Sequence, residues 1–188
     1  MSAAFADAAP QSRLLSKRFW RSFLPFPAVN CFGLGDRAPD FTLTETITRQ
    51  PYRLSQHWGE RPTVIAFTRI FTESHYCPIC FPHLVALNEA TEKFQAAGAQ
   101  LLFVTSTDLD QSQIVGTDLN LQAPLLSDPG CQVFHQYGTG QALGAPLSAQ
   151  FVLDKYGRIR FWHRFSFLHP NAEPRQLLYA LATLPTEQ

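Results

Sequence analysis

The residues best suited to chemistry are two cysteines three positions apart, in the run Cys77-Pro78-Ile79-Cys80. They stand where an apolar, β-rich run gives way to a helical pattern. Amides at the start of a helix are unpaired and, with the helix dipole, stabilise an anion, so a thiolate there has a depressed pKa. A second cysteine three residues on falls on the same face and can close a disulfide. The sequence therefore predicts reversible thiol chemistry, with Cys77, nearer the exposed end, as the nucleophile.

Two other interpretations of the pair stay open. Two buried cysteines can serve packing alone, because free cysteine is common in protein cores. A zinc site would take Cys77, Cys80 and His83 with His75 upstream, although these side chains rotate around a helix rather than converge. Attachment of a c-type haem is excluded, because Phe81 and not His follows the second cysteine. We expect neither a metal nor an organic cofactor.

Three further residues bear on this chemistry. Pro82 has no amide to bond back into the first helical turn, which predicts a pliable turn around the cysteines. Cys31 and Cys131 are solitary, and Cys131 opens another short helical pattern. For both we expect an unpaired structural role, with an additional resolving thiol as the alternative.

Composition narrows the class of protein. The chain has 188 residues, of which 45% are hydrophobic and 13% aromatic, enough for one globular domain with a filled core. Fifteen basic and fifteen acidic residues cancel, which argues against a nucleic-acid partner bound through bulk positive charge. No run approaches the roughly 20 apolar residues that a membrane span needs.

The elements that must position the cysteines follow a regular alternation. Residues 63–68 and 100–105 are continuous apolar runs, typical of strands buried on both faces. A helix is expected from Cys77 to about Ala97, and Asn171 is expected to cap a last helix. The remaining expected elements are a hairpin over 41–48 and 52–54, a helix over 108–119, a strand over 124–127, a short helix ending at Gly138, and a hairpin over 150–154 and 158–163. This pattern predicts an α/β fold, a three-layer sandwich with a mixed sheet.

Residues 1–34 read as an extension before a domain over 35–188. Within residues 13–24, aromatic and basic side chains recur on two faces of a predicted helix that ends at Pro25. Three interpretations of this helix compete: docking on its own domain or on a second copy of the chain, contact with a membrane surface, or a targeting peptide. The stretch lacks the apolar core of a secretory signal. We therefore expect a cytoplasmic protein, peripheral to a membrane under the second interpretation.

Four motifs, in this order and spacing, resemble the peroxiredoxin-like proteins of the alkyl hydroperoxide reductase/thiol-specific antioxidant (AhpC/TSA) family, within the thioredoxin superfamily. The resemblance covers about Gly35 to Leu184. The motifs are Gly35-Asp-Arg-Ala-Pro-Asp-Phe-Thr-Leu43, Tyr76-Cys-Pro-Ile-Cys80, Pro124-Leu-Leu-Ser-Asp-Pro129 and Phe151-Val-Leu-Asp-Lys-Tyr-Gly157. It implies a thioredoxin-like fold, a peroxide substrate and a thioredoxin-type reductant.

The resemblance also assigns roles to residues. Cys77 takes the position of the peroxide-attacking cysteine, which forms a sulfenic acid that a second thiol resolves. Ser74, with Thr72 as a nearby substitute, takes the position of a hydroxyl that hydrogen-bonds the thiolate and the peroxide. The family places a proline where this chain has Ile70, and an arginine where it has Ser148.

Arg69 is a candidate to supply the positive charge that the family arginine would provide. The alternative is that Arg69 is an ordinary solvated arginine at the end of a strand. Pro146 is an imperfect stand-in for the cis-proline of the thioredoxin branch.

The first functional hypothesis is thus an antioxidant thiol peroxidase in which Cys80 resolves the sulfenate of Cys77. The second is a dithiol–disulfide oxidoreductase acting on protein disulfides, because the loss of the family arginine weakens the case for fast peroxide reduction. The third is a redox-sensing or membrane-docked interaction protein.

Overall fold

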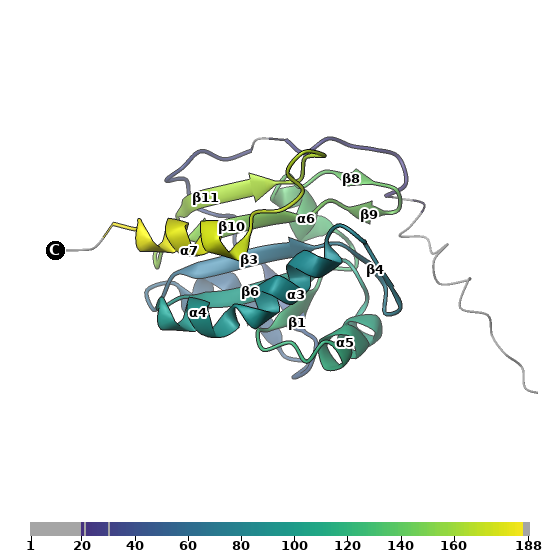
Figure 1. Cartoon of the computed structure of the whole chain (residues 1–188), viewed down its shortest axis with the longest axis horizontal. Coiled ribbons are helices and arrows are strands. Elements are labelled where there is room, and N and C mark those ends of the chain that lie inside the picture. The colour runs from purple at the N-terminus through teal and green to yellow at the C-terminus, as the bar shows by residue number, and fades with distance from the viewer. Residues whose placement is uncertain (1–19, 21, 30, 186–188) are drawn as a thin grey trace, which may run out of the picture.

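A seven-stranded mixed sheet forms the centre of the fold in the computed structural model, which describes residues 20, 22–29 and 31–185. The strand order is β11-β10-β3-β6-β7-β1-β2 (Figure 1). Its strands are β1 (Thr42–Glu45), β2 (Pro51–Arg53), β3 (Thr63–Thr68), β6 (Gln100–Thr105), β7 (Leu125–Ser127), β10 (Ala149–Leu153) and β11 (Ile159–Arg164).

The two apolar runs form the middle of this sheet. β3 and β6 pair in parallel, from Thr63 opposite Gln100 to Thr68 opposite Thr105. Every residue of β3 is buried, as expected for a strand covered on both faces. The predicted bounds of both strands are confirmed.

Antiparallel strands complete the sheet on both sides. β10 pairs antiparallel with β3 and with β11, and β1 pairs antiparallel with β2 and β7. Both predicted hairpins are therefore confirmed, and the sheet is mixed.

Helices cover the two faces of the sheet and bury an apolar cluster on each. One cluster packs α3 (Phe81–Glu89), α4 (Thr91–Ala96), α5 (Leu109–Asp118) and α7 (Pro174–Ala182) against the sheet. The other packs α6 (Gln132–Gln136) and the 3-10 helix η1 (Leu54–His57) against the opposite face. The predicted three-layer α/β sandwich is confirmed (Figure 1).

The predicted helix over residues 77–97 is wrong in two respects. It begins at Phe81, because Pro82 has no amide to donate to the carbonyl of Pro78, and the cysteines lie in the turn before it. It also breaks at Ala90, which ends α3 and precedes α4. The predicted apolar face survives the break, since Leu84 and Phe94 are both buried.

The predicted cap of the last helix is also wrong. α7 begins after Glu173, whose side chain forms a capping box with Gln176. The Asn171 side chain instead accepts a hydrogen bond from Gln150 Nε2 at 3.1 Å. Pro174 explains the shift, because proline is favoured in the first turn of a helix.

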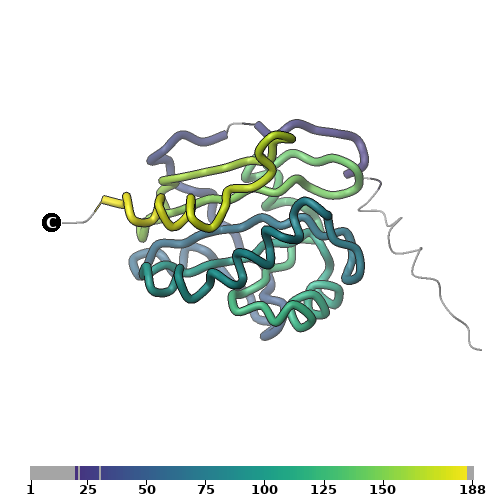
Figure 2. Tube along the Cα trace, viewed as in Figure 1, coloured from purple at the N-terminus to yellow at the C-terminus, as the bar shows by residue number. Residues whose placement is uncertain are grey.

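Most of the predicted amphipathic helix, including Leu15, Phe19 and the basic residues on its other face, lies outside the described residues. Within the described part of the chain, no helix is long and apolar enough to span a membrane. Residues 22–29 run alongside two short strands, β8 (Gln141–Ala142) and β9 (Ala145–Pro146) (Figure 2).

Candidate active site

The two cysteines follow a small hairpin that leaves the end of β3. Its strands, β4 (Ile70–Thr72) and β5 (His75–Tyr76), pair antiparallel with Ile70 opposite Tyr76. Arg69 immediately precedes β4 and Cys77 immediately follows β5, so the hairpin brings both residues to its open end. A proline at position 70 would disfavour this pairing, so Ile70 is compatible with the hairpin.

Both cysteines of the pair are free and nearly fully buried. Cys77 is 3% exposed and Cys80 is 2% exposed, whereas Ile79 between them is 53% exposed. The turn that holds them is closed by the amides of Cys80 and Phe81, which donate to the Cys77 carbonyl at 3.0 and 2.9 Å. The two thiols are therefore almost equally buried, and exposure alone does not distinguish the nucleophile.

Hydrogen bonding distinguishes the two thiols. A hydrogen bond from the Cys80 thiol lowers the pKa of Cys77 to about 5. Burial acts in the opposite direction, whereas the amides of Cys80 and Ile79 and the positive charge of Arg69 also lower this pKa. The same hydrogen bond, together with burial, raises the pKa of Cys80. A thiolate on Cys77 is thus stabilised while Cys80 keeps its proton. The geometry makes Cys77 the nucleophile and Cys80 the protonated partner.

Arg69 is held inside the molecule beside this pair. It is 8% exposed, its Nη2 donates to the carbonyl of Ala142, and its guanidinium lies 4.9 Å from the ring centroid of Phe71. Among the described residues, its buried Nε has no hydrogen-bond partner. The alternative of a solvated strand-end arginine is wrong. A buried positive charge beside a sulfur stabilises the thiolate.

The predicted hydroxyl groups lie together but are bonded elsewhere. The Thr72 Oγ1 and the Ser74 Oγ each lie 3.0 Å from His75 Nδ1, and 3.4 Å from each other. No hydrogen bond joins either hydroxyl to Cys77 among the described residues. The contact between Ser74 and the thiolate that the resemblance implies is therefore not formed in this conformation.

Behind the pair, Cys80 contacts the residue that replaces the family arginine. Its Sγ lies 3.7 Å from Ser148 Oγ, and the Ser148 hydroxyl donates to the carbonyl of Pro170 at 3.2 Å. The single thiol hydrogen of Cys80 serves either Ser148 or Cys77 at one time. Sequence reasoning identified Ser148 only as a departure from the family, and its contact with Cys80 depends on the tertiary fold.

His83 was a candidate zinc ligand together with the two cysteines, but another hydrogen bond fixes the orientation of its ring. Its Nε2 donates to the carbonyl of Ala172 at 2.7 Å, and burial lowers its pKa, so the neutral ring is favoured. Among the described residues, no cluster of three or more His, Cys, Asp or Glu side chains is placed to hold a metal ion.

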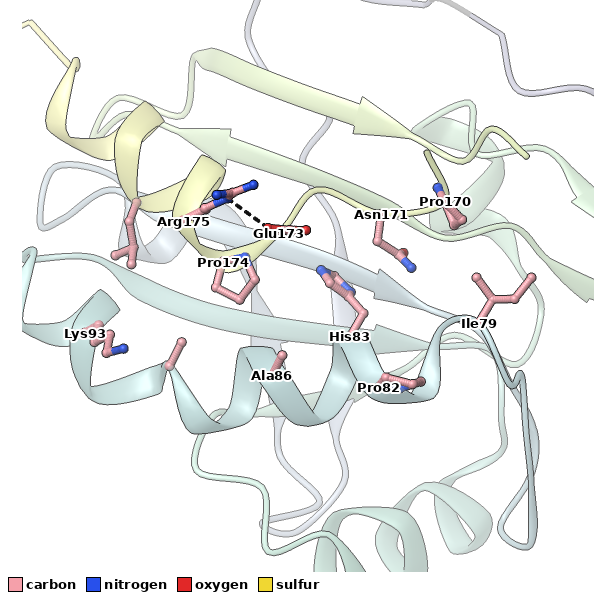
Figure 3. Close-up of a pocket in the computed structure, with 12 residues that line it drawn as sticks. Ile79, Pro82, His83, Ala86, Lys93, Pro170, Asn171, Glu173, Pro174 and Arg175 are labelled. Carbon is pink, nitrogen blue, oxygen red and sulfur yellow. Dashed lines mark ion pairs between the residues drawn. The ribbon is translucent and has the colours of Figure 1, made fainter. Parts of the chain in front are cut away.

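A groove begins beside the cysteine turn and runs between α3 and α7. Its volume is about 610 Å³, with Ile79 at one end and Lys93 toward the other (Figure 3). The rim of α7 carries the ion pair between Glu173 and Arg175, at 2.9 Å. The groove thus gives a partner molecule access to the exposed part of the turn.

The other two cysteines lie apart from this arrangement in the fold. Cys131 is 2% exposed and belongs to the apolar cluster on the α6 face of the sheet. Cys31 is exposed, with its thiol 3.7 Å from the carbonyl of Val29. A role for either as an additional resolving thiol stays a prediction.

The fold and site define the class of protein. The AhpC/TSA family profile matches residues 34–162, and the chain belongs to that family. It is 30% identical over 135 residues to Peroxiredoxin Q, chloroplastic, from Oryza sativa subsp. japonica and to the protein of that name from Arabidopsis thaliana. Each match covers 71% of this chain, but only 59% and 60% of the relatives' lengths.

A solved structure gives the same fold. Peroxidoxin BcpB from Mycobacterium tuberculosis superposes with a TM-score of 0.70 at 21% identity, over 81% of this chain and 98% of that one. The predicted thioredoxin-like fold and family resemblance are confirmed.

Proposed function

We propose that the chain is a thiol peroxidase that reduces hydrogen peroxide or organic hydroperoxides. The observation that carries the proposal is the setting of Cys77, which is 3% exposed and whose pKa is lowered to about 5 by the hydrogen bond from Cys80, with help from the charge of Arg69. A thiolate this buried admits a small oxidant more readily than the disulfide of a folded protein. Membership of the AhpC/TSA family supports the same chemistry.

The proposed reaction has two steps at sulfur. The Cys77 thiolate attacks one peroxide oxygen, the O–O bond breaks, and the leaving alkoxide or hydroxide takes a proton to become an alcohol or water, which leaves Cys77 as a sulfenic acid. Arg69 and the turn amides stabilise the negative charge on the reacting groups. The Cys80 sulfur then attacks the Cys77 sulfur, the S–O bond breaks, and water leaves with the Cys80 proton.

A dithiol reductant of the thioredoxin type completes the cycle by thiol–disulfide exchange, becoming oxidised as Cys77 and Cys80 regain their hydrogens. The exposed Ile79 and the groove beside it support docking of such a protein next to the turn.

Peroxide consumption tests the proposal directly. The reduced chain is mixed with hydrogen peroxide or cumene hydroperoxide, with thioredoxin and its reductase supplying electrons, and Cys131→Ser serves as a matched control. We expect turnover in both proteins, and intact mass should show a two-hydrogen loss assigned by peptide mapping to a Cys77–Cys80 disulfide. Peroxide left untouched by the fully reduced chain would overturn the proposal.

A second candidate function is dithiol–disulfide oxidoreductase activity toward proteins. The position of Ser74 favours it, because that hydroxyl is bonded to His75 instead of the thiolate, and a peroxide therefore lacks one expected partner. In this case the chain would reduce a model disulfide such as insulin while leaving peroxide unchanged.

A further inference from the structure

The strap, defined here as residues 22–29, is joined to the β8–β9 hairpin by backbone pairing. Phe26 and Gln141 exchange two hydrogen bonds, each from an amide to the other residue's carbonyl at 2.8 Å. The Gln141 side chain also donates to the carbonyl of Leu24 at 3.2 Å. The strap therefore acts as an additional edge for this hairpin (Figure 2).

Two glycines are required by this close approach. A Cβ on Gly140 would lie 2.6 Å from the Ala28 nitrogen and from the Phe26 carbonyl oxygen, and a Cβ on Gly138 would lie 2.5 Å from the Val29 carbonyl oxygen. Both also have positive φ, +73° and +64°. Glycine is the residue that fits where backbones approach this closely. The sequence is thus adapted to hold the strap against the hairpin.

The strap also holds the strained turn of the hairpin. Leu143 has a φ of 50°, a left-handed conformation that is unfavourable for a branched side chain, and it is 64% exposed. Its amide donates to the carbonyl of Phe23 at 3.2 Å, and the amide of Gly144 donates to that of Ser22 at 3.0 Å. These bonds stabilise a turn whose side chains supply little packing.

Ala142 connects this assembly to the active site. It lies between Gln141, which pairs with Phe26, and the turn residue Leu143. Its carbonyl accepts the hydrogen bond of Arg69 Nη2, and Arg69 and Cys77 flank the paired residues Ile70 and Tyr76 at the open end of the β4–β5 hairpin, where the charge of Arg69 acts on the Cys77 thiol. A backbone carbonyl can hold a buried guanidinium only if its own segment is fixed.

We propose that the strap is a positioning element for the active site: by fixing the β8–β9 hairpin, it keeps the Ala142 carbonyl in place and so keeps Arg69 beside Cys77. This inference rests on the proposed role of Cys77 as the nucleophile. It links a segment near the start of the chain to thiol reactivity through one hydrogen bond. Loosening the strap should therefore raise the pKa of Cys77 without touching either cysteine.

The test measures the thiol and not the peroxidase reaction. In full-length Phe26→Pro, position 26 loses the amide that donates to Gln141. Leu24→Pro is the matched control, because no hydrogen bond of the Leu24 amide is formed among the described residues. Thiolate absorbance and iodoacetamide alkylation, with peptide mapping to follow Cys77, give its pKa. We expect Phe26→Pro to raise it by about one pH unit, slowing alkylation near pH 5 about five-fold.

A double-mutant cycle distinguishes a strap that acts by positioning Arg69 from one whose loss loosens the structure in general. If the strap acts through Arg69, then Phe26→Pro added to Arg69→Gln should change the pKa of Cys77 little further, whereas independent effects add. Gly140→Ala, with Gly130→Ala as its control, repeats the test by a different route and serves if Phe26→Pro does not fold.

Each outcome decides the proposal. An unchanged pKa in a folded strap variant, or full additivity with Arg69→Gln, would overturn it. Because alkylation needs no peroxide, a chain that proved inactive toward peroxide would refute the proposed function while leaving this result intact.

Discussion

Two helices of this protein begin beside a cysteine, and their different surroundings explain why only one start is an active-site candidate. Cys80 stands at the start of α3 and Cys131 at the start of α6. At α6 the carboxylate of Asp128 accepts hydrogen bonds from the amides of Gln132, Val133 and Phe134, at 3.0, 2.8 and 3.1 Å. At α3 no side chain caps the helix and no acidic residue lies in its first turn.

The comparison shows that a cysteine at a helix start is not enough to make a reactive thiol. The unpaired amides at a helix start stabilise an anion that accepts their hydrogen bonds. At α6 the acceptor is the side chain of Asp128, whereas before α3 no side chain takes that place and the amides of Ile79 and Cys80 lower the pKa of Cys77.

The largest effect belongs to the nucleophile. Cys77→Ser should reduce peroxide consumption to the uncatalysed background, because a serine hydroxyl has no accessible anion at neutral pH. Cys131→Ser, at the other helix start, should stay within about two-fold of the parent because Cys131 is buried in the apolar cluster on the α6 face of the sheet. A peroxide-electrode or dye assay measures both, and equal losses would contradict the comparison.

The resolving thiol should affect turnover more than the first reaction. Cys80→Ser should consume about one peroxide per chain and then stop, because no second thiol displaces the sulfenic acid. Dimedone labelling at Cys77, seen by mass spectrometry, should detect that stalled state. Continued cycling of Cys80→Ser would show that another thiol, Cys31 for example, resolves Cys77.

Removing the buried charge beside Cys77 should slow its reaction without abolishing it. Arg69→Gln keeps a donor for the Ala142 carbonyl but loses the positive charge, and we expect a roughly 10- to 100-fold lower rate with peroxide. Stopped-flow tryptophan fluorescence measures that rate. Arg69→Lys should recover part of it, and a rate unchanged in Arg69→Gln would remove Arg69 from the mechanism.

The pH dependence should reveal the depressed pKa of Cys77. With a folded value of about 5, the rate with peroxide should be nearly constant at neutral pH and fall about ten-fold for each pH unit well below that value. A thiol with an ordinary pKa of about 8.5 would instead gain rate up to that pH.

The contribution of Cys77 to the free energy of unfolding should also increase with pH. Because folding lowers this pKa, the thiolate stabilises the fold at high pH, and the contribution is lost as pH falls through about 5. Urea unfolding of the reduced parent and of Cys77→Ser, compared between about pH 5 and 8, should show a parent advantage that grows with pH. An advantage that shrinks as pH rises would contradict the assigned direction.

The smallest effect on activity should come from the cap of α6. Asp128→Ala leaves three amides without their acceptor, two of them buried, so we expect a loss of about 1 to 2 kcal/mol in the free energy of unfolding. Peroxide consumption at low temperature should be unchanged, and Asp128→Asn should lose less stability. A large loss of activity in folded Asp128→Ala would show that the two helix starts are coupled.

Much of this protein followed from its sequence because the signals were local. The apolar runs over 63–68 and 100–105 predicted the central strands, since short continuous apolar runs rich in β-branched and aromatic residues are typical of strands buried on both faces. The spacing of Cys77 and Cys80 predicted the reactive pair, and Arg69 was a candidate for the missing positive charge, with a solvated arginine as the alternative. The predicted starts of two helices were wrong near Pro82 and Pro174. Proline lacks an amide and is favoured in the first helical turn, and these properties set the starts more strongly than the residue pattern did.

The tertiary structure decided what each of these groups does. No sequence pattern could show that Arg69 is held by the carbonyl of Ala142, because a backbone acceptor has no side-chain signature and lies far along the chain. The bonds of His83 to Ala172 and of Ser148 to Pro170 likewise arise only when separate segments meet. The sequence determined which atoms are able to react, since that depends on residue type and neighbours along the chain. Their burial and hydrogen-bond partners depend on distant segments, and so only the fold showed how Arg69 and Ser148 are placed around the two thiols.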